Sequence, residues 1–320
     1  MTGAKVVYRD FTDVLKHEAR LKLWLPLLTQ LKTQLRRPLR YFTLPGPLAL
    51  DVERWGLEGL LEFSGRGYPS VCFCDHDVSS FANAKRVLGN TRGVYAQFED
   101  IIMDSPDAAH KPFWDLFPYD AYNLDFCGSW FDGHDPLSRT FDAIVKLIDK
   151  HVRHTKSGPF LLFLTIRIDR ARFHPKTFDD LKKNLADNSL HRDFAGIVKN
   201  LTGGDISSFA DGNFRTFILT SIPKLVAFRS LPRSQRMMPA FLRLERLSYD
   251  RKGYSIGKFA FIIGKERANY RIYPDWYKAL VIKSLNPSSV VTVKENAVGR
   301  ATRDDLRELE AAVQRRVGYA

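Results

Sequence analysis

The residues best suited to chemistry in this chain stand at the ends of four short apolar segments. In chain order they are Thr43, Gly46, Asp75, Asp77, Glu99, Asp100, Asn123 and Asp125. A glycine after the first segment lets the backbone turn tightly and approach a ligand closely. A carboxylate after the second can accept hydrogen bonds from both hydroxyls of a ribose, and one after the third can accept from an adenine amino group. Asp125 would then face the reacting end of the ligand, so the set predicts a site for a nucleotide-type ligand.

Each of these residue types also has a purely structural use. Asp, Asn and Gly are common where a strand meets a helix, because they form turns and cap helix N-termini. Any one of the eight positions, taken singly, fits that use. Their order along the chain is what favours a ligand site, and both interpretations stay open at the level of the sequence.

Four strands would have to hold these residues at one edge of a sheet. The β-prone runs that supply them are residues 39–44, 70–74, 93–98 and 119–125. Helical segments at 48–61, 79–88 and 137–151 alternate with these runs, and the apolar run 160–168 follows. Such alternation is typical of a parallel sheet covered by helices on both faces. In open sheets of this kind, ligands bind beyond the carboxyl ends of the strands.

The remaining segments differ in pattern. A helix over residues 10–36 is expected to bend or split at Pro26. Further helices are expected at 178–185, 194–201 and 214–230, followed by strands at 241–249 and 259–264. The turn Asp250-Arg251-Lys252-Gly253 suits an antiparallel pairing of these two strands. A last helix, capped by Thr302, is expected to run to about residue 316.

The motifs along the predicted sheet resemble those of class I S-adenosylmethionine-dependent methyltransferases. The segment Tyr119-Asp120-Ala121-Tyr122-Asn123-Leu124-Asp125-Phe126-Cys127-Gly128-Ser129 is similar to the Asp-Pro-Phe/Tyr-Gly motif that ends the fourth strand in tRNA (guanine-N2)-dimethyltransferases and bacterial three-Cys-motif partner proteins. A helix and the run Phe160-Leu161-Leu162-Phe163-Leu164-Thr165 follow in the same order. The segment from Cys74-Asp75-His76-Asp77-Val78 to Asn90 and the closing run Lys258–Gly264 are also similar.

Over roughly residues 35–265, the resemblance implies a Rossmann-like methyltransferase fold. This is an α/β fold with a mostly parallel sheet, an antiparallel final strand pair, an N-terminal helix and a C-terminal helical extension. It divides the chain into a basic helical segment (1–38), a methyltransferase-like domain (39–265) and a basic, aromatic extension (266–320). It also implies S-adenosylmethionine as the cofactor, bound by Thr43, Gly46, Asp75, Asp77, Glu99, Asp100 and Asn123, with Asp125 as the catalytic residue.

Two departures from that pattern leave two functions open. Phe126 stands where the motif has proline, and Gly46 is a single glycine between Pro45 and Pro47, which lack backbone N–H donors. The chain is therefore expected to be either a methyltransferase-like protein that acts on or binds nucleic acid, or a catalytically inactive subunit with this fold that binds nucleic acid or assembles a multi-protein complex.

The charge distribution favours nucleic acid as a partner. Lysine and arginine number 49 against 36 acids, and residues 224–283 hold fourteen of these cations against four acids. A surplus of this kind indicates a polyanion partner, or else a solvated basic face. The cations predicted to contact phosphates are Arg233, Arg236, Arg243, Arg246, Arg251 and Lys252.

Other classes of protein are disfavoured. No apolar run approaches the roughly 18 residues of a membrane helix, and the three cysteines do not form a disulfide framework. The sequence has no Walker loop, and its cysteines and histidines do not complete a zinc motif, so no metal is expected. We expect a cytoplasmic protein without membrane partners.

Overall fold

The computed structural model of the protein describes residues 13–104, 107–126, 139–154, 157–187, 192–231, 237–251, 253–267 and 275–317. The chain divides into two compact units. The first comprises Met1–Ile101, Ser105–Asn123 and Val293–Ala320, and the second comprises Ile102–Asp104 and Leu124–Thr292. The expected three-segment division of the chain stays a prediction.

Parallel strands form the centre of the first unit. β1 (Tyr41–Thr43) pairs with β2 (Val71–Asp75) on one side and with β4 (Ala121–Asp125) on the other, and β3 (Arg92–Tyr95) pairs with β2. The division between the units falls within β4, after Asn123. β1 and β4 are buried throughout, as expected for strands covered on both faces. The register pairs Thr43 with Phe73 and with Asn123, so the carboxyl ends of the three strands lie side by side.

Short helices follow these strands. They are α3 (Leu50–Leu57), α4 (Val78–Leu88), α5 (Phe98–Met103) and α6 (Lys111–Trp114). α4 starts directly after β2 because the side chain of Asp77 accepts from the backbone N–H of Ser80, and it ends at Gly89, whose φ is +60°. β3 is shorter than the predicted strand over 93–98, because Phe98 already begins α5 and is buried with Ile101.

The N-terminal helices of the first unit are α1 (Val14–Ala19), the π-helix η2 (Arg20–Trp24) and α2 (Leu25–Leu35). Pro26 lies where η2 runs on into α2 without a break, so its missing N–H removes a hydrogen bond to the preceding turn, and the irregular π-helical turn stands directly before it. The helix α13 (Arg300–Val317), preceded by the 3₁₀ turn η5 (Glu295–Ala297), packs on α1 and α3. Thr302, expected as its cap, lies inside it and donates to Glu18 at 2.6 Å.

Long strands form the sheet of the second unit. β7 (Tyr254–Arg267) pairs antiparallel with β5 (Phe160–Ile168) and with β6 (Met237–Arg251), and β8 (Val290–Val293) is the neighbour of β6. The predicted antiparallel pair is confirmed, and both strands are longer than expected. A register shift at Phe241/Arg243 marks an irregularity in β6.

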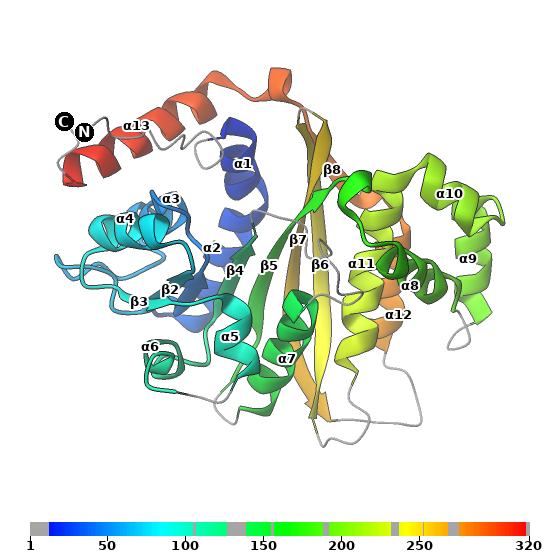
Figure 1. Ribbon diagram of the computed structural model, residues 1–320, viewed down its shortest axis with the longest axis horizontal. Helices are drawn as coiled ribbons and strands as arrows, with labels where there is room; N and C mark the ends of the chain where they lie inside the picture. Colours follow the sequence, from blue (N-terminus) through cyan, green and yellow to red (C-terminus); the bar gives the residue numbers. More distant parts are fainter. Residues whose placement is uncertain are drawn as a thin grey trace. The chain divides into compact units, whose positions relative to one another are not determined.

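Helices accompany this sheet in the second unit. They are α7 (Arg139–Arg153), α8 (Pro175–Ala186), α9 (Arg192–Thr202), α10 (Ile206–Gly212), α11 (Phe214–Ser230) and α12 (Asp275–Leu285), with 3₁₀ turns η3 (Arg170–Arg172) and η4 (Pro287–Ser289). α11 is buried along most of its length, despite Pro223 within it, because it packs on α8, α12 and β6. Figure 1 shows α11 and α12 running along β6.

The strand order is β3-β2-β1-β4-β5-β7-β6-β8. The first four of these strands supply the parallel part, and β7 is antiparallel to both of its neighbours. The predicted α/β class, a Rossmann-like methyltransferase fold with an antiparallel final strand pair, is confirmed. Among the described residues, none of the helices is both long and apolar enough to cross a membrane.

Candidate cofactor site

The turn after β1 has the shape expected of a ligand-binding loop. Gly46 has a φ of +65°, in the left-handed region that glycine adopts without strain. Its carbonyl oxygen accepts from the N–H of Ala49 at 3.2 Å, and Ala49, also at positive φ, precedes α3. Between Pro45 and Pro47, the N–H of Gly46 is the single backbone donor. The turn can therefore offer a ligand close approach but few backbone hydrogen bonds.

A buried polar cluster lies where β1, β4 and α3 meet. The side chains of Tyr41, Thr43 and Asn123 all donate to Oδ2 of Asp51, at 3.0, 2.6 and 2.9 Å. Asp51 is 1% exposed. Burial raises the pKa of Tyr41, and the nearby Asp51 carboxylate raises it further. Oδ1 of Asp51 and Oδ1 of Asn123 are buried, and among the described residues no donor reaches either of them. The cluster thus has two acceptors that no donor satisfies.

Asp51 was not among the candidates from the sequence, although a signal was present. The expected helix 48–61 is apolar at Leu50, Val52 and Trp55, and Asp51 stands among them. A carboxylate on the buried part of a helix needs donors, and here they come from two strands. By contrast, Thr43 and Asn123 were predicted, and the structure brings them together at 3.1 Å between Nδ2 of Asn123 and Oγ1 of Thr43.

The two acids after β2 have different positions. Asp75 is half-buried at the carboxyl end of the strand, and burial raises its pKa. Its Oδ1 accepts from the N–H of Asp77 at 2.9 Å, and no side chain of the described residues donates to it. Asp77 is exposed and caps α4, and the N–H of Ser80 lowers its pKa. Asp75 is therefore the ligand candidate of the two, whereas Asp77 serves as the N-cap of α4.

Glu99 and Asp100 do not follow β3 directly, as the sequence analysis expected. β3 ends at Tyr95, and both acids lie in the first turn of α5. Negative side chains in the first turn stabilise a helix, because its N-terminal end carries a partial positive charge. The expected strand-end position of these residues is wrong, because Phe98 turns inward as the start of a helix.

Asp125, at the end of β4, belongs to the second unit and is 8% exposed. Its Oδ2 lies 3.8 Å from Nζ of Lys258 on β7, and that ammonium donates to Oγ1 of Thr165 at 3.0 Å. Lys258 is fully buried. Phe126 follows it, and the rest of the motif resembling the methyltransferase one lies outside the described residues.

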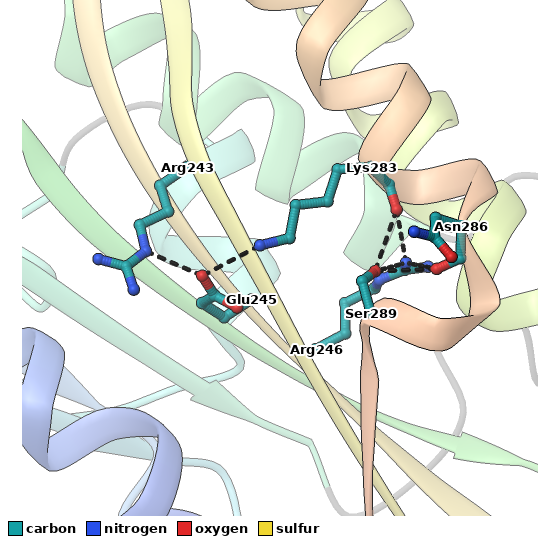
Figure 2. Close-up of polar contacts among 6 residues, drawn as sticks. All are labelled: Arg243, Glu245, Arg246, Lys283, Asn286 and Ser289. Carbon is teal, nitrogen blue, oxygen red and sulfur yellow. Dashed lines mark hydrogen bonds and ion pairs between the residues drawn. The ribbon is translucent and has the colours of Figure 1, made fainter.

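Arg246 was predicted to contact phosphates, and this prediction is wrong. Its side chain is 1% exposed and closes the C-terminal end of α12 (Figure 2). The guanidinium donates to the carbonyl oxygens of Leu219, Lys283, Ser284 and Asn286, at 2.6 to 2.7 Å, and to Oγ of Ser289. Burial lowers the pKa of Arg246 to about 10. A nucleic acid cannot reach this group.

The other cations predicted to contact phosphates differ in exposure, and some of them lie outside the described residues. Arg243 is 47% exposed and shares Glu245 with Lys283, at 2.8 and 3.1 Å (Figure 2). Arg251 is half-buried. Arg233, Arg236 and Lys252 lie outside the described residues. The charge surplus of residues 224–283 is partly internal, because Lys224, Arg246 and Lys258 are all buried.

Two comparisons with known proteins find a match. A family model described as PP_RS20740-like matches residues 15–212, more than half of the chain. Among solved structures, the plantazolicin methyltransferase BpumL in complex with pentazolic desmethylPZN analog and SAH is similar at 10% identity and a TM-score of 0.33. That likeness covers 78% of this chain and 89% of the other, and at this TM-score it says nothing of activity or substrate. No curated protein matches the sequence. The expected closeness to tRNA (guanine-N2)-dimethyltransferases and three-Cys-motif partner proteins stays a prediction.

Proposed function

The chain belongs to the PP_RS20740-like family, and we propose that it binds S-adenosylmethionine in its first unit and acts as a methyltransferase-like protein on nucleic acid. The observation that carries the proposal is the pair of unsatisfied acceptors beside the β1 turn, in the same unit as the half-buried Asp75. Acceptors that lack donors call for a ligand that brings them.

The residues present fit the two polar ends of this cofactor. Oδ1 of Asp51 and Oδ1 of Asn123 can accept from an ammonium group, which has three donors and no acceptor. The carboxylate of Asp75 can accept from the two hydroxyls of a ribose, since its hydrogen bond from Asp77 leaves Oδ2 open. The strand register supports a single site, because Thr43 on β1 pairs with Phe73, two residues before Asp75.

When bound, S-adenosylmethionine supplies an electrophilic methyl group. The chain's own contribution in the first unit is to bind and orient: Gly46 gives close backbone approach, and Asp75 holds the nucleoside end. Asp125 is the candidate that would hold a substrate amine, through a hydrogen bond to its carboxylate. Nζ of Lys258 lies 3.8 Å from that carboxylate and would help to hold it in position.

A second candidate function is a catalytically inactive subunit that retains the fold and binds nucleic acid or other proteins. The small exposure of Asp125, at 8%, and its ion pair with the buried Lys258 favour this alternative, because both describe a carboxylate engaged within the protein. Methyl transfer separates the two candidates, whereas cofactor binding is compatible with either.

Isothermal titration calorimetry with S-adenosylmethionine and its demethylated product tests the proposal. We expect the wild-type chain to bind both, and Asp75→Asn to weaken binding by about 1–3 kcal/mol, the usual loss for a hydrogen bond to a charged group. Asp115→Asn is the matched control, since Asp115 is exposed and no side-chain contact of it is described. Absence of binding at millimolar cofactor, or equal losses in both variants, would refute the proposed site.

Transfer of a labelled methyl group is the second measurement. Incubating the protein with labelled cofactor and mixed RNA or DNA should give labelled nucleic acid if the chain is active. Cofactor binding without any transfer would support the inactive subunit instead. Loss of transfer in Asp125→Asn with unchanged cofactor affinity would identify Asp125 as a catalytic residue.

A further inference from the structure

A basic cavity of about 480 Å³ lies in the first unit, where α2 ends and α3 ends. Its lining includes the side chains of Lys32, Arg36 and Arg37, two threonines of α2, and the turn Glu58-Gly59-Leu60 after α3. Of the residues that line it, none is aromatic and one is acidic. These residues are separate from the β1 turn and the Asp51 cluster.

Two of the three cations are free to bind an anion. Within the described part of the chain, Lys32 and Arg36 have no carboxylate partner, and Arg36 is exposed. Glu58, the acid in the lining, already pairs with Arg54 at 2.6 Å. Nothing in the cavity therefore neutralises Lys32 and Arg36, and an anion would find two available positive charges.

The third cation is held in place. Both terminal nitrogens of Arg37 donate to the carboxylate of Asp120, at 2.7 and 2.8 Å, and this hydrogen bonding raises the pKa of Arg37. Asp120 is itself fixed, because it also accepts from the N–H of Arg40 at 2.7 Å. These two hydrogen bonds fix the guanidinium of Arg37 at the wall of the cavity.

The backbone at Arg36 is in a conformation that usually belongs to glycine. Arg36 follows the last residue of α2 with a φ of +54° and a ψ of 31°. Glycine adopts this left-handed conformation at helix ends without a steric penalty, whereas arginine does not. A positive charge at the C-terminal end of a helix is favourable in itself, and Arg36 also lines the cavity, where its charge is available to an anion.

We propose that this cavity binds the backbone phosphates of a nucleic-acid strand. Lysine, arginine and threonine side chains are the groups that proteins direct at phosphate oxygens. The lining has no aromatic surface on which a base could stack, so contacts here would be independent of sequence. This inference deepens the nucleic-acid part of the proposed function and rests on it.

The test compares two double variants with the same loss of charge. In the first, Lys32→Gln and Arg36→Gln remove the free cations of the cavity. In the control, Lys199→Gln and Arg315→Gln remove two exposed cations elsewhere that also lack a carboxylate partner among the described residues. Fluorescence anisotropy with a labelled single-stranded RNA is recorded from about 50 to 200 mM salt, where the slope of log affinity against log salt is about −0.7 per phosphate contact.

We expect the cavity variant to bind more weakly at low salt and to flatten that slope by about 1.4, which corresponds to two lost single-strand contacts. The control should keep the wild-type slope. Arg36→Gly serves as a variant that should not unfold the helix end; it should lower RNA affinity without lowering the thermal midpoint. Equal slopes in the two double variants, or no RNA binding by the wild type, would overturn the inference.

Two further measurements separate the alternatives. Displacement of the RNA by millimolar ADP, or equal affinity for heparin, would show that the cavity takes any phosphate or any polyanion, which also overturns the inference. Calorimetry with the demethylated cofactor on the cavity variant should give the wild-type affinity. RNA binding with no cofactor binding would refute the cofactor site and leave the phosphate cavity standing.

Discussion

Replacing Arg246 with methionine puts an apolar side chain of similar length in the interior. It removes the guanidinium that binds the carbonyl oxygens at the C-terminal end of α12. Five acceptors would lose a donor: four carbonyl oxygens and one hydroxyl. The carbonyl oxygens of Lys283 and Asn286 would keep the Ser289 hydroxyl as a second donor (Figure 2). Each hydrogen bond from a charged group contributes about 1.5–3 kcal/mol, but the desolvation of the buried guanidinium offsets much of that sum. A buried acceptor left without a donor costs about 1–3 kcal/mol, and with several such acceptors we expect a loss of at least that size in the free energy of unfolding.

Arg243→Met is the matched control, because it changes the same residue type on the same strand. Arg243 is 47% exposed and pairs with Glu245, which keeps Lys283 as a second partner, so its loss should cost about 0–1 kcal/mol. Urea unfolding followed by circular dichroism measures both variants. The slope of RNA affinity with salt should stay at the wild-type value in Arg246→Met. A loss in Arg246→Met that is no larger than in Arg243→Met would refute the structural role.

Three more results follow from the structure. Burial lowers the pKa of His17 below its usual 6.5, against the opposing effect of Asp305. The stability that neutral His17 contributes should therefore be full above about pH 6.5 and decline as the pH falls. The free energy of unfolding of His17→Gln, measured across the same pH range, should lack that decline. Asp77→Ala should lower the thermal midpoint and leave affinity for the demethylated cofactor unchanged, because Asp77 caps α4. Gly89→Ala should cost about 2 kcal/mol or more in urea unfolding, since a Cβ there meets a backbone oxygen at 2.4 Å, and Gly158→Ala, with open space around it, should not.

The sequence was informative wherever a local pattern decides the structure. The alternation of apolar runs and helices predicted the parallel strands, and the polar residues after β1, β2 and β4 were expected at their carboxyl ends. Glu99 and Asp100 were misplaced, because a short apolar run such as residues 93–98 can end as a strand or continue into the start of a helix, and here Phe98 begins α5.

Long-range contacts could not be predicted in the same way. An arginine is usually a surface residue, and nothing near Arg246 in the sequence shows that the carbonyl oxygens at the end of α12 will enclose it. Asp51 depends on donors from two strands, one of them about seventy residues away. The cavity at Lys32 and Arg36 depends on how the ends of α2 and α3 come together. Charge counts marked residues 224–283 and the basic segment 1–38 alike. They could not show that Arg246 of the first is buried, or that Lys32 and Arg36 of the second line a cavity.

Hydrogen exchange with and without the demethylated cofactor tests most directly the claim that the first unit holds a cofactor beside the β1 turn. Mass spectrometry of peptic fragments reports the exchange of backbone amides segment by segment. We predict that the cofactor slows exchange in peptides covering Gly46 to Asp51 and Asp75 to Asp77, and that this protection is lost in Asp75→Asn but kept in Asp115→Asn. Protection confined to other segments, or no protection at saturating cofactor, would contradict the account.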